Sequence, residues 1–252
     1  MEYPRLVRGT LLRRYKRFLA DIRLDDGREV VAHCPNTGSM RAVNVPGCRV
    51  WLAASDNPAR KLAWTWELIE LPQPGGETAL ASVHTGRANR IVEEALRAGR
   101  VPALSGYASL KCEAKVEDGR LDFRLDDPGR GIAFVEVKQV TLREPDGHGY
   151  FPDAVSARGR KHLLSLAALA EQGRRAVLLF CVAHTGIRDV AAAAHLDPAY
   201  AATLKEAVMR GVEVLAYGCE IGWRDERPVS IALGRALPVS LDREYHVALS
   251  VD

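Results

Sequence analysis

The stretch GRLDFRLDDPGRGIAFVEVKQVTL, residues 119–142, most constrains what this chain can fold into. Two apolar segments flank a short turn that contains Asp-Pro-Gly, which is the pattern of a β-hairpin. With the turn centred on Gly129, Asp122 lies directly opposite Glu136, and directly opposed side chains have Cβ atoms about 5 Å apart. Because side chains alternate along a strand, Lys138 shares a face with Glu136. The hairpin therefore brings three charged side chains together in an apolar sheet.

Two carboxylates this close repel each other unless a cation lies between them. Lys138 supplies part of that charge, and a divalent ion could supply more. Mg²⁺ is typically held by one or two carboxylates, with waters and phosphate oxygens as its other ligands. The pattern predicts Asp122 and Glu136 as ligands of Mg²⁺ or Mn²⁺, with Lys138 orienting or deprotonating a water or stabilising charge on a phosphate. The alternative is an ion pair among the three residues with nothing bound.

The composition indicates a soluble globular protein. Its 252 residues are 47% hydrophobic and 27% charged, and this length suits one large domain or two modest ones. The longest apolar run, residues 176–183, is too short to cross a membrane. The N-terminus has no apolar signal region, so we expect a cytoplasmic protein. The five cysteines form no C-x-x-C pair, which favours reduced core thiols over disulfides or zinc.

The overall fold class that we expect is α+β, with two domains. Strands are predicted over 9–24, 28–34, 48–54 and 61–71, with Gly, Asn and Pro turns between them, and this pattern suits an OB-like β-barrel over residues 1–74. The segment PQPGGET, residues 72–78, is the clearest boundary. Aromatic residues in this part either stack on nucleic-acid bases or fill the barrel core; they are Tyr15, Phe18, Trp51, Trp64 and Trp66.

Residues 75–252 are expected to form an α/β domain with a mixed sheet flanked by helices. Its periodicity predicts helices over 85–99, 153–172 and 197–210, with Thr85 as a helix N-cap. The predicted strands are 107–117, 120–126, 132–142, 175–183 and 212–221. The tail from residue 223 has no assigned structure.

The distribution of charge suggests a partner that carries phosphates, such as a nucleic acid. The net charge of +3 does not by itself indicate nucleic acid, but the first seventeen residues are strongly basic. We predict DNA contacts from this segment and from the helix after the hairpin, where phosphate contacts would position the strand without reading its sequence. The alternative in both places is a solvated face. The predicted DNA-binding residues are Arg13, Arg14, Lys16, Arg17, Arg158 and Lys161, and His162 lies beside the last two.

The order helix, strand with Asp, strand with Glu-x-Lys and helix resembles the PD-(D/E)xK nuclease fold. In that superfamily a Glu on the leading helix often completes the metal site, and the candidates here are Glu93 and Glu94. A literal Pro-Asp pair occurs at Pro152-Asp153, but it follows the Glu-x-Lys strand. Asp153 is therefore expected as a residue at the N-terminus of a helix.

Longer motifs resemble the sugar fermentation stimulation protein family from residue 2 to about residue 239. They include RYKRFLADIRLDDGR, HCPNTGSM, ANRIVEEAL, FVEVKQVTL and GYFPDAVSARGRKHL. The resemblance implies DNA binding, a link to regulation of sugar utilisation, an OB-like N-terminal domain and a nuclease-like C-terminal domain. It also implies Glu94, Asp122, Glu136 and Lys138 as the catalytic set. Two hypotheses follow, a metal-dependent deoxyribonuclease and a non-catalytic DNA-binding regulator on a nuclease scaffold.

Overall fold

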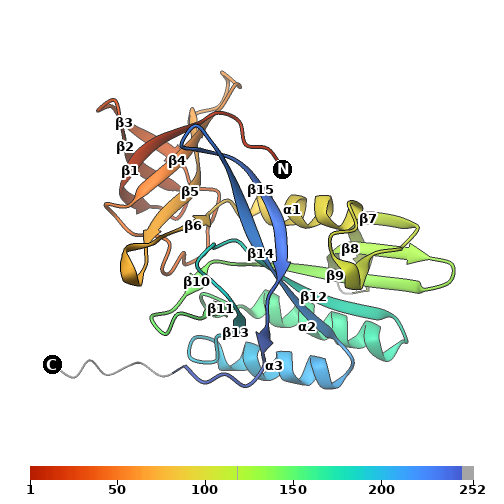
Figure 1. Cartoon of the computed structure of the whole chain (residues 1–252). Coiled ribbons are helices and arrows are strands. Elements are labelled where there is room, and N and C mark those ends of the chain that lie inside the picture. Colours follow the sequence, from red (N-terminus) through yellow and green to blue (C-terminus); the bar gives the residue numbers. More distant parts are fainter. Residues whose placement is uncertain (118, 246–252) are drawn as a thin grey trace.

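The structure is a computed structural model, and it describes residues 1–117 and 119–245. A small barrel forms one end of the molecule, and a larger sheet with helices on both faces forms the other (Figure 1). This arrangement confirms the expected fold class, an OB-like barrel followed by an α/β domain with a mixed sheet. Within the described residues, no helix is long and apolar enough to span a membrane.

The barrel is one six-stranded sheet in the order β3-β2-β1-β4-β5-β6, and a further pairing of β3 with β5 closes it. Alternation explains the inward faces, since Ala20, Ile22 and Leu24 are buried along β2 and polar residues lie between them. Trp66 and Trp51 are buried too, so these two belong to the core, whereas Phe18 is 45% exposed. The strands are β1 (Leu6–Tyr15), β2 (Leu19–Leu24), β3 (Glu29–His33), β4 (Arg49–Ala54), β5 (Trp64–Pro72) and β6 (Thr78–Ser82).

The larger sheet has the order β15-β14-β12-β9-β8-β7. Its central strand β12 runs parallel to both neighbours and is almost wholly buried, as expected where helices cover both faces. The strands are β7 (Ser109–Val116), β8 (Gly119–Asp127), β9 (Gly131–Val140), β12 (Arg175–Val182), β14 (Glu213–Arg224) and β15 (Arg227–Ala236). The unassigned tail thus supplies β15, which forms a hairpin with β14 at the edge of the sheet.

Helices cover the two faces of this sheet through alternate side chains of β9. Val135 and Val137 pack in the same cluster as the buried side of α1, while Phe134 packs with α2 and α3. The helices are α1 (Gly86–Arg97), α2 (Ala157–Glu171) and α3 (Pro198–Met209), with 3₁₀ turns at Pro74–Gly76 and Pro102–Leu104. A small third sheet contains β10 (Leu142–Arg143), β11 (Gly149–Phe151), β13 (Val190–Ala192) and β16 (Val239–Ser240).

The start of α2 differs from the expectation. The helix begins at Ala157, and Ser156 is its N-cap, because the Ser156 hydroxyl accepts the Gly159 N–H at 3.1 Å. Asp153 lies before the helix, and its carboxylate accepts the backbone N–H of Met40 at 2.9 Å. Asp153 is therefore a contact to the barrel, not a helix residue. Thr85 is the N-cap residue of α1, as predicted, but its hydroxyl donates to Pro35 O at 2.8 Å and does not cap the helix.

Backbone pairing joins the barrel to the larger domain. The Ser82 N–H donates to Ala183 O at 2.8 Å, and the Thr185 N–H donates to Leu80 O at 2.8 Å. At the chain start, the Tyr3 N–H donates to the carbonyl of Val229 in β15 at 2.8 Å. The predicted division between residues 74 and 75 thus remains a prediction. Strand β6 follows that division but pairs into the barrel, and the first residues of the chain precede it but pair with the larger domain.

We expect low pH to reduce the stability of the fold through His184, which lies at this junction and is 2% exposed. Burial, followed by the charge of Arg143, lowers the pKa of His184 to about 4. Between pH 6.5 and 4 the unfolded chain takes up a proton that the folded chain does not. The free energy of unfolding therefore falls as the pH is lowered through this window, by up to about 3 kcal/mol.

His184→Asn keeps an acceptor for the Gly186 N–H, which His184 Nδ1 accepts at 3.0 Å, and removes the titration. Urea unfolding at pH 7 and pH 4.5 should show a smaller loss of stability in this variant than in the wild type. Some loss should remain, because burial also lowers the pKa of His84 to about 4. An equal loss in the two proteins would contradict the prediction.

Candidate active site

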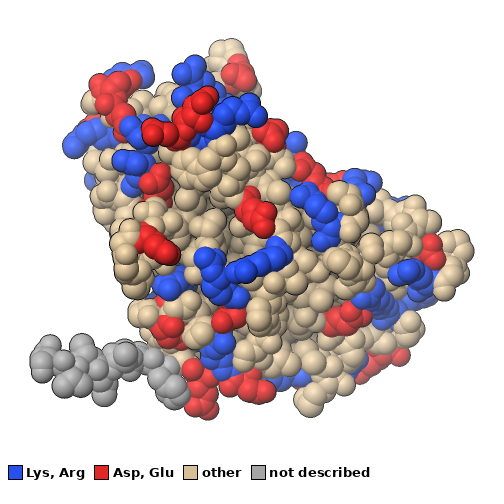
Figure 2. All heavy atoms as spheres, in the orientation of Figure 1, with Lys and Arg blue, Asp and Glu red and all other residues tan. Residues whose placement is uncertain are grey.

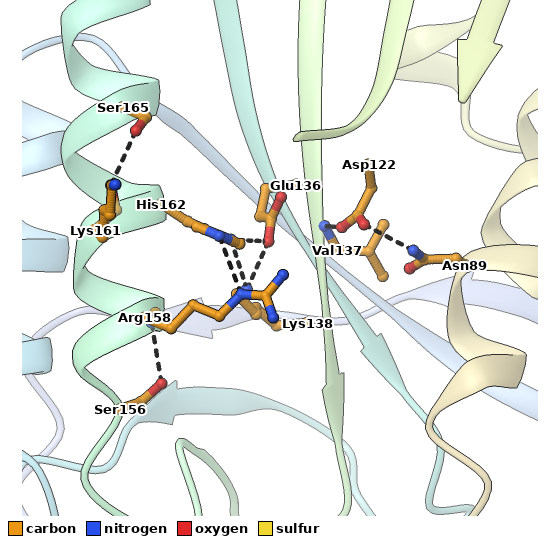
Figure 3. A network of polar contacts seen from close by, with 11 residues as sticks. Asn89, Asp122, Glu136, Val137, Lys138, Ser156, Arg158, Lys161, His162 and Ser165 are labelled. Carbon is orange, nitrogen blue, oxygen red and sulfur yellow. Dashed lines mark hydrogen bonds and ion pairs between the residues drawn. The ribbon is translucent and has the colours of Figure 1, made fainter. Parts of the chain in front are cut away.

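The hairpin of β8 and β9 has the predicted register. Phe123 pairs with Val135 and Asp127 pairs with Gly131, so the turn is centred on Gly129. Asp122 lies one step beyond the last of these pairs. Its carboxylate accepts the Val137 N–H at 2.7 Å through one oxygen and the Asn89 side-chain amide at 2.7 Å through the other (Figure 3). Asp122 therefore stands beside the Glu-x-Lys segment.

The Glu136 carboxylate is the centre of the cluster, and it is 2% exposed. Its Oε1 accepts the Lys138 ammonium at 2.6 Å and also contacts Nδ1 of His162, which α2 brings over the sheet (Figure 3). Nδ1 of His162 lies 3.2 Å from Lys138 Nζ, and its Nε2 accepts from Arg158 Nε at 3.4 Å. From the sequence, His162 was placed only among candidate phosphate contacts. The one sequence signal for its position was its spacing of four residues from Arg158, which puts the two side chains on one face of a helix.

The second oxygen of Glu136 is different. Oε2 is buried and has no hydrogen-bond partner within the described part of the chain. Burial alone would raise the pKa of Glu136, but contacts with His162 and Lys138 outweigh burial and hold that pKa below its ordinary value. Burial, followed by the charge of Glu136, raises the pKa of Asp122. One charged carboxylate thus lies beside another that resists charging, which is a favourable setting for a cation.

The leading helix α1 brings Asn89 to this site, and not a glutamate. Glu94 pairs with the N-terminal ammonium at 2.7 Å and with Arg90 at 3.2 Å. Glu93 pairs with Arg97 at 2.8 Å. The structure therefore brings Asp122, Glu136 and Lys138 together but leaves both helix glutamates out of the cluster.

A cavity of about 850 Å³ opens beside the cluster. Asn89, Asp122, Glu136, Lys138 and His162 line one part of it. The barrel lines another part through the loop 36–39 and Arg17. The candidate site is thus shared by the two parts of the molecule.

The predicted DNA-binding residues fall into two groups. Arg13 pairs with Asp21 at 2.7 Å, and one nitrogen of Arg14 donates to three backbone carbonyls, so both have structural partners. The side chains of Lys16, Arg17 and Lys161 make no hydrogen bond or ion pair within residues 1–117 and 119–245, and Arg158 touches only His162. Of the predicted residues, Arg17 and Arg158 line the cavity. On the face in Figure 2, basic and acidic side chains are interspersed, so that face has no uniform basic patch.

The donors at the site suit Mg²⁺ or Mn²⁺. The buried Oε2 of Glu136 is available, and Asp122 lies close by with both oxygens accepting from neutral donors, the Asn89 amide and the Val137 N–H. No three His, Cys, Asp or Glu side chains gather as a metal-binding group among the residues that the structure describes. A pair of carboxylates still fits Mg²⁺, because this ion usually keeps several water ligands.

An acid–acid–lysine cluster on a mixed sheet with helices on both faces defines a PD-(D/E)xK nuclease-like domain, here joined to an OB-type barrel. Family models divide the chain in the same order. The SfsA N-terminal OB domain matches residues 12–80, and the sugar fermentation stimulation protein RE domain matches residues 86–224. The chain therefore belongs to the sugar fermentation stimulation protein family.

Individual relatives extend the match to nearly the whole chain. The sugar fermentation stimulation protein homolog of Chromohalobacter salexigens is 67% identical over 244 residues, which are 96% of each chain. A homolog from Shewanella baltica is 52% identical and covers 95% of this chain and 99% of the relative. The solved structure of Pyrococcus furiosus SfsA in complex with Ca²⁺ has a TM-score of 0.81 at 28% identity, with 95% and 98% of the two chains covered.

Divalent cations should stabilise the fold through the two carboxylates. We expect Mg²⁺ or Mn²⁺ to raise the melting temperature, because a ligand that binds only the folded state adds about 2.7 kcal/mol at a hundred times its Kd. Asp122→Asn and Glu136→Gln should remove this rise, as measured by thermal unfolding with and without the ion. Glu94→Gln is the matched control and should keep it. A loss of the rise in Glu94→Gln alone would assign the ion to the helix instead.

Proposed function

We propose that this chain is a divalent-metal-dependent nuclease that binds DNA and cuts its phosphodiester bonds at the Asp122, Glu136 and Lys138 cluster. The observation that carries the proposal is the buried Oε2 of Glu136, which lacks a partner among the described residues and lies beside Asp122 on a cavity wall. A buried, charged oxygen without a partner costs free energy unless a ligand satisfies it. The Ca²⁺ in the structure of the Pyrococcus furiosus relative supports a divalent ion as that ligand.

Asp122 and Glu136 would hold Mg²⁺ or Mn²⁺, which supplies a bound water of lowered pKa and stabilises negative charge on a phosphate. The chain positions these ligands closely. Lys138 and His162 both hold Oε1 of Glu136, which fixes the rotation of the carboxylate and leaves Oε2 for the ion. The Val137 N–H and the Asn89 amide each donate to one oxygen of Asp122, which fixes the rotation of that carboxylate.

Lys138 has a second role in this proposal. Its ammonium lies 2.6 Å from Glu136 Oε1, so its position is set by the same contact that orients the metal ligand. From there it would orient the attacking water and stabilise the charge that builds on the phosphate. Arg17 and Arg158, on the cavity wall, would hold neighbouring phosphates, since such contacts position a strand without reading its sequence.

A non-catalytic DNA-binding regulator of sugar utilisation is the second candidate. The observation that favours it is Asn89, which occupies the place on α1 where an acid would add a third carboxylate to the site. In this alternative the cavity binds the DNA backbone and no bond is cut.

Cleavage of plasmid and of single-stranded DNA in Mg²⁺ or Mn²⁺ separates the two candidates. We expect the wild type to cut at least one substrate. Glu136→Gln and Lys138→Met should lower the cleavage rate by at least about a hundredfold, because each removes a group that acts on the transition state. The rates come from gel analysis of time courses, with EDTA added to one series.

Arg174→Ala is the control, because this exposed arginine lies outside the cavity lining, and it should cut like the wild type. Equal cleavage by wild type and Glu136→Gln would indicate a contaminating nuclease. Binding that weakens with salt, as phosphate contacts require, together with no cleavage of any substrate, would establish the regulator.

A further inference from the structure

The barrel loop at residues 35–40 is fixed against the nuclease-like domain at both of its ends. At one end the Thr85 hydroxyl donates to Pro35 O at 2.8 Å. At the other end the Asp153 carboxylate accepts the Met40 N–H at 2.9 Å. The loop is therefore held as one wall of the cavity that contains the acidic cluster, and it does not depend on the barrel alone for its position.

Arg14, in strand β1 of the barrel, also holds this loop in place. One guanidinium nitrogen donates to Asn36 O and Gly38 O, each at 2.9 Å, and to Arg17 O at 2.7 Å. Arg17 has a positive φ of 65° in the turn between β1 and β2. Arg14 thus ties the loop and the backbone of Arg17 into one unit and leaves the Arg17 side chain free.

The cavity side of this unit carries unused hydrogen-bond donors. Thr37 and Ser39 are exposed on the cavity wall, and their backbone N–H groups make no hydrogen bond within the part of the chain that the structure covers. The Arg17 guanidinium lines the same wall and is unpaired among the described residues. The Ser39 hydroxyl accepts the Arg41 N–H at 3.2 Å and keeps its own proton to donate. A cation beside amide and hydroxyl donors is the chemistry that binds a phosphate.

The size of the cavity limits what can connect this wall to the acidic cluster. Its volume of about 850 Å³ lies within the range of roughly 300–1,000 Å³ that is typical of pockets for small ligands. A segment of one strand, one or two nucleotides long, fits such a space. A strand with one phosphate at the acidic cluster would present its neighbouring phosphate to another wall of the same cavity.

From this geometry we infer a second phosphate subsite, built by the barrel from Arg17, Thr37 and Ser39, that binds the phosphate next to the reacting one on a single strand. The inference rests on the proposed function, because it takes the acidic cluster as the place of the reacting phosphate. It also gives the barrel a direct role at the site, in place of a remote DNA-binding role.

Short oligothymidylates test the subsite by binding. Thymidine 5′-monophosphate and the 5′-phosphorylated dinucleotide compete with a fluorescent oligothymidylate in Ca²⁺, in a Lys138→Gln background in which cleavage is suppressed. The dinucleotide should compete about tenfold better than the mononucleotide, which is the range for one charge-assisted hydrogen-bonded contact. This tenfold gain in affinity from mononucleotide to dinucleotide is called the step. Arg17→Ala should abolish the step and leave the affinity of the mononucleotide unchanged.

Arg174→Ala is the matched control. The Arg174 side chain is also exposed and has no ion pair among the described residues, but it follows the C-terminal end of α2, away from the cavity lining. It should keep the tenfold step. Thr37→Val, which removes only a hydroxyl, should reduce the step. Melting temperatures of all variants show whether the fold is intact. For longer oligothymidylates, Arg17→Ala should reduce the slope of log affinity against log salt concentration by about the amount of one phosphate contact.

The inference is overturned if Arg17→Ala keeps the step, if it weakens the mononucleotide equally, or if neither thymidylate competes. Cleavage by the wild type is measured separately. A step that depends on Arg17 without any cleavage would defeat the nuclease proposal alone, whereas cleavage without such a step would defeat the subsite alone.

Discussion

Burying the carboxylate of Glu136 within a sheet is the physical demand on which the rest of the site depends. Such a group needs compensating charge, because an unpaired buried charge costs several kcal/mol. Lys138 provides positive charge from two residues further along β9, and His162 adds a contact to the same oxygen from α2. Apolar packing with Phe134 holds α2 on this face of the sheet, which brings His162 over Glu136. The oxygen of Glu136 that stays without a partner among the described residues gives the proposed metal its physical reason.

The seam between the barrel and the larger domain makes the site composite. Backbone bonds join β6 to residues 183–185, and Thr85 and Asp153 hold the two ends of the barrel loop. Contacts of this kind keep a cavity wall in place better than a flexible linker would, since each fixes a backbone group. The barrel therefore belongs to the architecture of the candidate site and is more than a neighbouring module.

Much of the fold was predictable from local pattern, and the failures have identifiable causes. The register of β8 and β9 followed from the two-residue period and the turn at Gly129. The helix contribution did not follow, because Asn89 and Glu93 lie one turn apart on α1, and only the angle of that helix to the hairpin selects between them. Asp153 was assigned to a helix from its neighbours, whereas its partner, Met40, is distant in sequence.

What the sequence by itself determined is the hairpin with Asp122, Glu136 and Lys138, the order of barrel and mixed sheet, and the family, because these depend on short-range periodicity and on long motifs. Only the tertiary structure decided which of two similar arginines is structural. Arg14 and Arg17 lie three residues apart in one basic segment, yet one nitrogen of Arg14 donates to three backbone carbonyls while Arg17 lines the cavity. Two of those carbonyls come from a loop more than twenty residues away, so packing, not composition, sets the role of each charge.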